Sequence, residues 1–400
     1  MKRAEQIDQI KTLLARLDSG TNVDAGGVRY NPTSSYTDPE LAAVERSEFF
    51  DHHPQIVGLS GDLAEPGSFM TFDELGTPIL ATRTASGEFK AFVNACRHRG
   101  VVIESAERGR KRRFACPFHN WTYDGNGTLV GLPKSDHFGE LDRAELGLVP
   151  LPAVEREGLL WVHPQPNGVI DPDELLGAEL AADLADWDLG KLRRLGGDRY
   201  DVDCNWKLAM DTFGETYHFP VLHSDTLSAA FHGNVQCYDT FGRNHRMLLC
   251  RREIDEMRKL PPDDWDLCTA TLPVYWLFPN TQLIPSGSVV YVVRAYPDAQ
   301  DPGRHTSRIS FYLRPHVSVD TASGDATGED GVHMAEEVAR GFGNIIRDED
   351  YAMSASQQRS ANSGALSHVV FGRNEPALHH FHNTYRAALG RELLQLHPTG

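Results

Sequence analysis

Apolar and polar residues alternate along two parts of this 400-residue chain, and the alternation predicts antiparallel strands in both parts. In the first half, short apolar runs are separated by glycine turns, which predicts small sheets. These runs lie at 77–84, 88–94 and 158–164. In the second half the apolar runs are longer and predict neighbouring antiparallel strands. These runs lie at 245–252, 271–284, 288–297 and 306–315.

Apolar residues at helical spacing predict three helices outside the strands. The first lies near the N-terminus, where Ile10, Leu13 and Leu17 share one side. The second lies within 334–358, and the third runs from about 375 to 396. An apolar stripe on the third helix favours packing over metal binding for its histidines. We therefore assign no function to His379, His380 and His382.

Length and composition fit a protein with more than one packed domain. The chain exceeds the usual size of a single domain, and 40% of its residues are hydrophobic. Loose polar stretches are confined to about 297–307 and 318–331. The net charge of −17 argues against nucleic acid and anionic membrane surfaces as partners. No apolar run is long enough for a signal peptide or a membrane span, so we expect a cytoplasmic location.

Two Cys–His pairs form the strongest motif of the chain. Cys96-Arg-His98 is followed by Cys116-Pro-Phe-His119. Two thiolates and two imidazoles are the ligand set of a Rieske [2Fe–2S] cluster, which carries one electron at a time. The same residue types also suit a structural zinc ion. Zinc fingers usually place both cysteines first, whereas here each pair mixes a cysteine with a histidine, so the order favours the Rieske cluster.

A second metal motif lies in the segment 205–223. Glu215 and His218 are three residues apart, which places them on one face of a helix, and His223 follows five residues later. Pro220 should end or kink that helix and let the chain bring His223 back toward His218. Two imidazoles and one carboxylate form the facial triad of non-haem Fe(II) oxygenases, which leaves positions open for dioxygen.

The third ligand of such a triad must come from a distant segment. Asp348, Glu349 and Asp350 lie where the predicted helix within 334–358 becomes acidic. Asp350 lies four residues beyond Ile346 on the inward side, so we predict Asp350 as the ligand and keep Glu349 as the alternative. The other interpretation is that all three acids form a solvated helix end.

The segments 96–100 (CRHRG), 116–127 (CPFHNWTYDGNG), 205–223 and 349–358 together resemble the catalytic α-subunit of Rieske non-haem iron oxygenases, the aromatic ring-hydroxylating family. The resemblance implies an α+β fold. It consists of a small all-β Rieske domain and a helix-grip (START-like) catalytic domain, with an antiparallel sheet and long C-terminal helices. One departure is Asn120, where the family usually has glycine; asparagine tolerates left-handed backbone better than most residues.

The resemblance also implies a division into domains. We expect residues 1–51 to form an N-terminal helical segment that packs on the catalytic domain. Residues 52–165 are then the Rieske [2Fe–2S] domain, and residues 166–400 the catalytic domain with its mononuclear iron.

The cofactors implied by the resemblance are one [2Fe–2S] cluster, one Fe(II) ion and O2. The cluster would be held by Cys96, His98, Cys116 and His119. The single iron would be held by His218, His223 and Asp350. Electrons would come from NAD(P)H through a separate ferredoxin or flavin reductase, because no nucleotide-binding fingerprint occurs in the chain. The resemblance further implies a homotrimer, alone or with β-subunits as α3β3.

Glu215 has a separate catalytic role in this resemblance. The equivalent acid hydrogen-bonds an iron-ligand histidine and, across the trimer interface, a cluster-ligand histidine of the neighbouring subunit. Many ring-hydroxylating members have aspartate there, so the longer Glu215 weakens a direct transfer of their substrate class. Asp211, four residues earlier, is a further candidate for the same hydrogen-bonded shell.

The stretch around and between the two Cys–His loops is basic, against the acidity of the whole chain. We predict that it docks an acidic electron donor. Its cations are Arg97, Arg99, Arg108, Arg110, Lys111, Arg112 and Arg113.

Substrate identity follows less directly from the sequence. The main prediction is hydroxylation of an aromatic or other small apolar substrate; the alternative is demethylation or monooxygenation of a quaternary ammonium or methylated amine, held by aromatic rings. Arg294 and Arg308 would suit a substrate carboxylate if they faced the pocket, which the pattern leaves open. The candidate pocket residues, each of which core packing also explains, are Phe213, Leu227, Phe231, Tyr275, Trp276, Tyr291 and Phe311.

A protein that only carries electrons is the alternative to an enzyme; it would hold two irons per chain, whereas an oxygenase would hold three.

Overall fold

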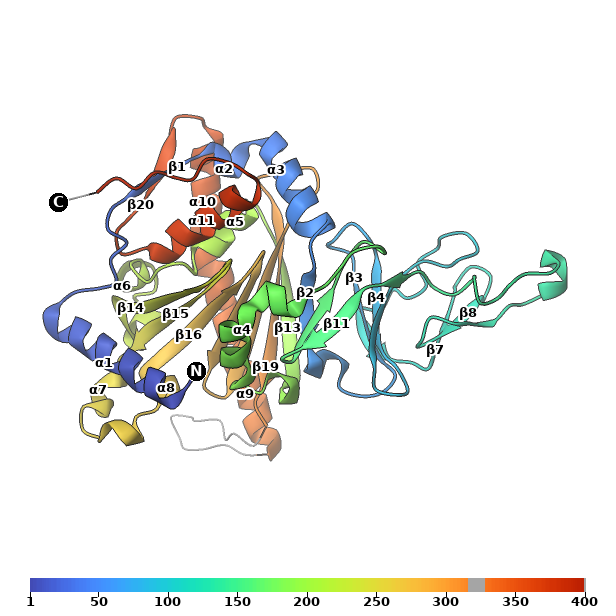
Figure 1. Ribbon diagram of the computed structural model, residues 1–400, viewed down its shortest axis with the longest axis horizontal. Coiled ribbons are helices and arrows are strands. Elements are labelled where there is room, and N and C mark those ends of the chain that lie inside the picture. Colours follow the sequence, from blue (N-terminus) through green and yellow to red (C-terminus); the bar gives the residue numbers. More distant parts are fainter. Residues whose placement is uncertain (316–327, 399–400) are drawn as a thin grey trace. The chain divides into compact units, whose positions relative to one another are not determined.

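The computed structural model describes residues 1–315 and 328–398 (Figure 1). The chain divides into two compact units, one of residues 46–172 and 188–193 and the other of residues 1–45, 173–187 and 194–400. The sequence-based domain boundaries after residues 51 and 165 remain a prediction. Of the loose stretch predicted at 318–331, residues 318–327 lie outside the described residues.

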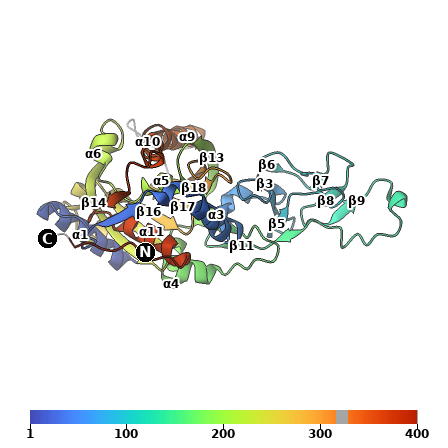
Figure 2. The same ribbon diagram turned by 90° about the horizontal axis from the view of Figure 1, so that it is seen from above.

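The unit that contains residues 46–172 is built mainly from short strands. A five-stranded sheet has the order β10-β5-β4-β3-β6, and two three-stranded sheets have the orders β11-β12-β2 and β7-β8-β9 (Figure 2). The runs predicted at 77–84, 88–94 and 158–164 contain β4, β5 and β12. The strands are β2 (Gln55–Leu59), β3 (Ser68–Phe72), β4 (Ile79–Arg83), β5 (Phe89–Val93), β6 (Arg108–Arg110), β7 (Arg113–Ala115), β8 (Thr122–Asp124), β9 (Leu129–Gly131), β10 (Pro150–Leu151), β11 (Ala153–Arg156) and β12 (Leu159–Val162).

The larger unit contains a seven-stranded sheet of order β13-β19-β18-β17-β16-β15-β14. The run predicted at 271–284 is two strands, because the chain turns at Phe278-Pro279-Asn280 and pairs back on itself. A separate pair, β1 (Arg29–Pro32) and β20 (His368–Phe371), is antiparallel. The seven strands are β13 (Arg193–Val202), β14 (Phe231–Phe241), β15 (Asn244–Arg251), β16 (Thr271–Leu277), β17 (Thr281–Ser286), β18 (Val289–Pro297) and β19 (His305–Leu313).

The helices lie at both ends of the chain and in the connections. The predicted C-terminal helix is shorter than expected, because α11 ends at Ala388 and Gly390 takes a left-handed φ of 62°. Within the described residues no helix has both the length and the apolar character of a membrane span. The α-helices are α1 (Arg3–Ser19), α2 (Ser34–Thr37), α3 (Pro39–Arg46), α4 (Pro172–Ala185), α5 (Trp206–Asp211), α6 (Phe219–Leu222), α7 (Ile254–Met257), α8 (Leu267–Ala270), α9 (Gly328–Ile345), α10 (Tyr351–Asn362) and α11 (Pro376–Ala388). Two π-helical segments are η1 (Ser47–Asp51) and η7 (Ile346–Asp350), and 3₁₀ turns are η2 (Ser60–Leu63), η3 (Ser135–Phe138), η4 (Leu189–Lys191), η5 (Leu227–Ala229) and η6 (Pro262–Asp264).

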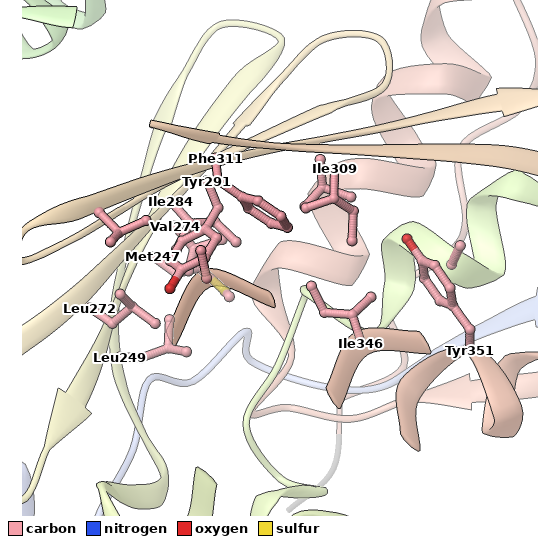
Figure 3. Close-up of a cluster of buried hydrophobic side chains, with 14 of the residues drawn as sticks. Met247, Leu249, Leu272, Val274, Ile284, Tyr291, Ile309, Phe311, Ile346 and Tyr351 are labelled. Atoms are coloured by element: carbon pink, nitrogen blue, oxygen red, sulfur yellow. The ribbon is translucent and has the colours of Figure 1, made fainter. Parts of the chain in front are cut away.

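The central strands β15 to β18 are buried on both faces, and strand alternation sends neighbouring residues to different cores. On β15, Leu248 and Cys250 belong to the cluster that packs on α1, which lies beside β14 in Figures 1 and 2. Met247 and Leu249 belong to the cluster on the opposite face. Figure 3 shows that second cluster, with strand side chains facing Ile346 and Tyr351. This second face carries the cavity described below.

Candidate metal centres

The two Cys–His loops end in the same backbone geometry. The amide of Gly100 donates to the carbonyl of Cys96 at 2.8 Å, and the amide of Asn120 donates to the carbonyl of Cys116 at 2.9 Å. Gly100 has a φ of 74° and Asn120 a φ of 58°, the left-handed region that favours glycine and asparagine. Asn120 therefore takes the place of a second glycine without distorting its loop.

The four candidate cluster ligands form an inner pair of thiols and an outer pair of imidazoles. Cys96 and Cys116 are buried, His98 is half-buried and His119 is exposed. The Nδ1 atoms of the two histidines lie 3.2 Å apart, as two ligands of one ion would. The indole of Trp121 stacks on His98 with ring centroids 5.1 Å apart, which holds that ring in place.

The thiol pair occupies a position that favours a bound cation. Burial raises the pKa of the Cys96 thiol, against the opposing hydrogen bonds from the His98 amide and the Tyr123 hydroxyl. Cys116 beside it raises this pKa further. A metal ion is the partner that stabilises two adjacent thiolates in such a place.

The grouping of ligand atoms bears on the choice between zinc and a two-iron cluster. Among the described residues, three ligand atoms come within 4.8 Å of one another at His218, His223 and Asp350 only. Two separate pairs, one of sulfur and one of nitrogen, fit a [2Fe–2S] cluster better than one tetrahedral zinc ion. The residues present therefore fit the cluster.

The second motif brings Glu215 and His218 together by a different local structure from the predicted helix. The prediction that both lie on one helix face is wrong: α5 ends at Asp211, α6 begins at Phe219, and Glu215 and His218 lie in the turn between them. The Glu215 carboxylate accepts hydrogen bonds from the amides of Tyr217 and His218, which closes the turn. Pro220 stands in the first turn of α6 and does not end a helix.

Asp350 and Glu349 lie in the π-helical segment η7, and each contacts the histidines differently. Asp350 Oδ1 is 3.5 Å from Nε2 of His218 and 3.5 Å from Nε2 of His223. Glu349 Oε2 instead accepts from Nδ1 of His223 at 2.6 Å and from the hydroxyl of Thr226 at 3.0 Å. The π-turn thus presents two consecutive acids to one site, as such turns often do at functional positions.

The geometry of His218, His223 and Asp350 fits a metal ion. Their three ligand atoms lie within 4.8 Å of one another, close to the spacing of ligands around a single ion. Nε2 of His218 is buried and has no hydrogen-bond partner among the described residues. Its Nδ1 is 2.5 Å from Glu215 Oε1, so Nε2 faces the triad. An orphaned nitrogen lone pair beside a buried carboxylate is what an iron ligand requires.

The charges around the triad also favour a cation. Burial opposes protonation of His218, but the neighbouring carboxylates of Asp350 and Glu215 raise its pKa to about 9. Burial likewise opposes protonation of His223, yet Asp350 and Glu349 raise its pKa. Burial disfavours the Asp350 carboxylate, and the two imidazoles outweigh that effect and lower its pKa. A bound metal ion would take the place of these protons.

Asp211 lies near the triad but pairs elsewhere. Its carboxylate accepts from the Tyr36 hydroxyl at 2.8 Å and lies 2.9 Å from Nε2 of His382. Asp211 and Glu375 line an open hollow of about 770 Å³ that also reaches Glu215, His218 and Asp350. Burial raises the pKa of Glu375 to about 7, so the hollow holds a readily protonated acid.

A second cavity, narrow at about 40 Å³, lies between the triad and the buried face of the sheet. Three of the predicted pocket residues line it, namely Phe213, Leu227 and Phe231. Phe219 and Phe342, which were not among the predicted pocket residues, also line it. The other cavity walls are aliphatic: Leu249, Leu272, Val274, Ile284, Ile345 and Ile346.

The remaining predicted pocket residues do not line this cavity. Tyr291 and Phe311 belong to the same apolar cluster and contact each other at 5.9 Å between ring centroids (Figure 3). The Tyr275 hydroxyl donates to Asp183 at 3.0 Å. Trp276 packs against Phe381 on α11, with ring centroids 4.8 Å apart.

The predicted basic cluster is partly neutralised by ion pairs. Arg108 pairs with Asp62 at 3.0 Å and Lys111 with Glu104 at 2.5 Å, and Arg110 pairs with Glu65. Arg112 and Arg113 have no ion pair with a described residue. Arg99 lies over the exposed ring of Phe118, 5.1 Å from its centroid. The free positive charge is therefore smaller than the sequence suggests.

Two family models match this chain. A Rieske [2Fe-2S] domain model matches residues 53–150, and the model of the ring hydroxylating alpha subunit (catalytic domain) matches residues 189–391, half of the chain. The chain belongs to this family. It is the α-subunit of a Rieske oxygenase, and the predicted family and fold class are confirmed. An iron–sulfur cluster and a non-haem iron are the cofactors that this membership implies.

Curated relatives of this Rieske oxygenase carry names of two substrate classes. The glycine betaine monooxygenase oxygenase subunit of Chromohalobacter salexigens is 30% identical over 50% of this chain and 44% of its own length. The carnitine monooxygenase oxygenase subunit of Acinetobacter baumannii is 25% identical over 83% of this chain and 87% of its own. The chlorobenzene dioxygenase subunit alpha of a Cupriavidus species is 30% identical over 53% of this chain and 49% of its own. The first and third matches thus span less than half of those proteins.

Solved structures confirm the fold of this oxygenase subunit. The quaternary ammonium Rieske monooxygenase CntA in complex with L-carnitine has a TM-score of 0.74 at 20% identity. The alignment covers 92% of this chain and 97% of the CntA chain. At that identity the likeness establishes the fold and leaves the substrate to the chemistry of the cavity.

Proposed function

We propose that this Rieske oxygenase inserts one oxygen atom into a C–H bond of a quaternary ammonium substrate. The observation that carries the proposal is the composition of the cavity. Its phenylalanine and aliphatic walls lead to the carboxylates of Asp350 and Glu215, and no lysine or arginine is among the lining residues. Aromatic faces and nearby carboxylates favour a bulky, methylated cation. The carnitine and glycine betaine monooxygenase relatives support the alternative substrate prediction over the aromatic one.

Four phenylalanines give this cavity its chemistry. Phe213, Phe219, Phe231 and Phe342 line it, and the ring of Phe219 lies 5.0 Å from His218 and 5.6 Å from Phe231. A trimethylammonium group loses little on leaving water for such a site, because its charge is spread over methyl groups and faces the rings. The carboxylates of Glu215 and Glu349 keep the triad end acidic when Asp350 holds a metal ion.

In this proposal His218, His223 and Asp350 hold Fe(II), and Cys96, His98, Cys116 and His119 hold the cluster. The bound iron would supply the site of dioxygen activation, and the cluster would deliver electrons singly. In the overall reaction R–H, O2, two electrons and two protons give R–OH and H2O. The apolar walls exclude bulk water and keep the substrate C–H bond beside the triad.

Glu215 and Glu349 set the orientation of the two imidazoles. Each carboxylate accepts from Nδ1 of its histidine, so both histidines present Nε2 to the same point. Such partners fix the tautomer and increase ligand basicity. Glu215 also lines the open hollow, where a proton or hydrogen bond can pass to a group outside the cavity.

We further propose that the electrons reach the iron from the cluster of a neighbouring subunit in a homotrimer. Inter-subunit electron transfer is described for CntA. The hollow around Glu215, His218 and Asp350 has exposed apolar residues, Val221, Met353 and Val370, among those that line it, as a protein interface requires. A ferredoxin or flavin reductase, fed by NAD(P)H, would load the cluster beside Arg99, Arg112 and Arg113.

Hydroxylation of an arene is the second candidate. The chlorobenzene dioxygenase relative and the apolar cavity walls favour it. Acidic groups at the triad give a neutral ring no added binding energy, whereas they attract a cation.

A matched pair of compounds tests the proposed substrate class. Choline and its neutral isostere 3,3-dimethylbutan-1-ol share a shape and differ in charge. The reduced holoenzyme is mixed with ¹⁸O2 and one compound at a time. The compounds are choline, the isostere, γ-butyrobetaine and chlorobenzene, and labelled product is measured by mass spectrometry. We expect an oxygenated product from choline or γ-butyrobetaine and none from the isostere; because an aldehyde product exchanges its oxygen with water, the product is reduced to the alcohol with borohydride as soon as it forms.

Two results would contradict the proposal. One is equal oxygenation of the cation and its isostere; the other is product from chlorobenzene alone, which would establish the second candidate. His218→Ala serves as the control variant, because it removes an iron ligand and leaves the Cys–His loops intact. Product formation by His218→Ala would contradict the assigned iron site.

A further inference from the structure

Arg251 lies next to two residues that line the cavity and has no ion pair with a described residue. It is the last residue of β15, two residues beyond Leu249 on the same face of the strand, and Leu249 lines the cavity. Its cross-strand neighbour is Phe231, another lining residue. The guanidinium carbon lies 5.3 Å from the centroid of the Phe231 ring.

Among the described residues, the hydrogen-bond acceptors of the Arg251 guanidinium are neutral oxygens. Nε donates to the carbonyl of Thr271 at 3.1 Å, and Nη2 donates to the Ser286 hydroxyl at 3.0 Å. Both acceptors adjoin the cavity wall, because Thr271 precedes Leu272 and Ser286 follows Ile284 by two positions on one face of β17. The Nη1 amino group has no acceptor among the described residues. A positive charge in this half-buried place is costly without an anion.

Arg251 and the triad lie at the two ends of a row of aromatic contacts. A chain of ring contacts leads from His223 to Phe219 at 5.2 Å, from Phe219 to Phe231 at 5.6 Å, and from Phe231 to Arg251 at 5.3 Å. Two phenylalanine rings therefore separate the cationic guanidinium from the acidic triad. A substrate that extends past these rings would meet carboxylates at one end and a guanidinium at the other.

The two arginines predicted as alternative carboxylate-binding residues lie on the other side of the sheet. Arg294 and Arg308 are cross-strand partners, and each is next to a residue of the cavity-side cluster, Val293 and Ile309. Strand alternation therefore sends both arginines to the opposite face, so they cannot contact a substrate in the cavity. The question that the sequence pattern left open for these two arginines is settled by their register.

We infer that Arg251 binds the carboxylate of a zwitterionic substrate, so that the enzyme favours trimethylammonium carboxylates over alkylammonium ions that lack a carboxylate. This inference rests on the proposed function. The ammonium end lies among the phenylalanines near the triad, and the carboxylate lies against Nη1 and Nη2 of Arg251. Arginine suits this task because its planar fork matches the two carboxylate oxygens.

The test uses γ-butyrobetaine and its methyl ester, which differ in the negative charge. Binding of each compound to the oxidised holoenzyme is measured by titration calorimetry, without turnover. We expect the parent enzyme to prefer the free carboxylate by about 10- to 100-fold, the range for a charge-assisted hydrogen-bonded pair. Arg251→Gln should remove this preference and leave the affinity for the ester unchanged. Arg251→Lys should retain a part of it.

Arg252→Gln is the matched control, because Arg252 is the adjacent residue, carries the same charge and is exposed. We expect it to bind both compounds as the parent does. Iron content and the cluster absorption spectrum establish that each variant is folded and loaded.

The outcomes separate the inference from the proposed function. Equal affinity of the parent enzyme for acid and ester, or an Arg251→Gln variant that keeps the preference, would overturn the role of Arg251 and leave the proposed substrate class standing. A parent enzyme that neither binds nor oxygenates either compound, nor choline, would overturn the proposed function itself.

Discussion

Replacing Glu349 by glutamine should weaken the binding of the mononuclear iron without disturbing the cluster. Glu349 accepts from Nδ1 of His223 at 2.6 Å and from Thr226 at 3.0 Å. Glutamine keeps the size of the side chain but loses the negative charge that makes His223 basic and fixes its tautomer. Loss of such a partner typically lowers metal affinity by 10- to 100-fold, or about 1.4 to 2.7 kcal/mol.

The assay removes the mononuclear iron with a chelator and measures Fe(II) rebinding under anaerobic conditions. The cluster absorption of each sample serves as an internal reference, because Glu349 belongs to the other unit of the chain. Asp348→Asn is the matched control: Asp348 is the adjacent acid, is exposed and pairs with Arg347 at 2.6 Å. An Asp348→Asn protein should bind iron like the parent. If Glu349→Gln did so too, the role assigned to Glu349 would be refuted.

Three further predictions concern other parts of the molecule. His305 is buried, and burial lowers its pKa from 6.5 to about 4. As pH falls, His305 therefore binds a proton in the unfolded state at a higher pH than in the folded state. The free energy of unfolding should decrease between about pH 6.5 and 4, by up to about 3 kcal/mol. His305→Gln should flatten that loss in denaturant titrations at pH 7 and pH 5, and an unchanged slope would exclude His305 as the cause. Asn120→Ala places alanine at a φ of 58° and should destabilise the second cluster loop by about 1–2 kcal/mol, seen as cluster bleaching at a lower temperature, whereas Asn120→Gly should not. Replacing Arg112 and Arg113 by glutamate should slow cluster reduction by the protein donor and weaken the salt dependence of that reaction. Reduction by dithionite should stay at the parent rate. A variant that the protein donor reduces as fast as the parent would reject donor docking at these residues.

The family and the fold class could be predicted from the sequence because metal ligands come in local, ordered patterns. Cys96 and His98 lie within one loop, and alternation in the second half of the chain marks strands buried on both faces. The local conformation around His218 could not be predicted in the same way. A spacing of three suits a helix, but a carboxylate that accepts from backbone amides stabilises a turn at the same spacing.

Residues that act through long-range contacts were harder to find. Glu349 was considered as an iron ligand, yet its contact with His223 depends on a π-turn that has no clear sequence signal. Arg251 was not considered, although Met247, Leu249 and Arg251 alternate along one strand. The sequence shows that alternation, but it does not show which set of side chains faces the cavity. The facing set depends on the pairing of β14 with β15.

The alternation along β15 has a consequence for altering this enzyme. One set of its residues faces the cavity side of the sheet, and the intervening set packs toward α1. Point substitutions at 247, 249 or 251 therefore alter the cavity side and leave the packing on α1 in place. Deleting or inserting a single residue would exchange the two sets at once. Directed evolution of specificity should therefore succeed with libraries of fixed length at these three positions and fail with libraries that vary the length of the strand.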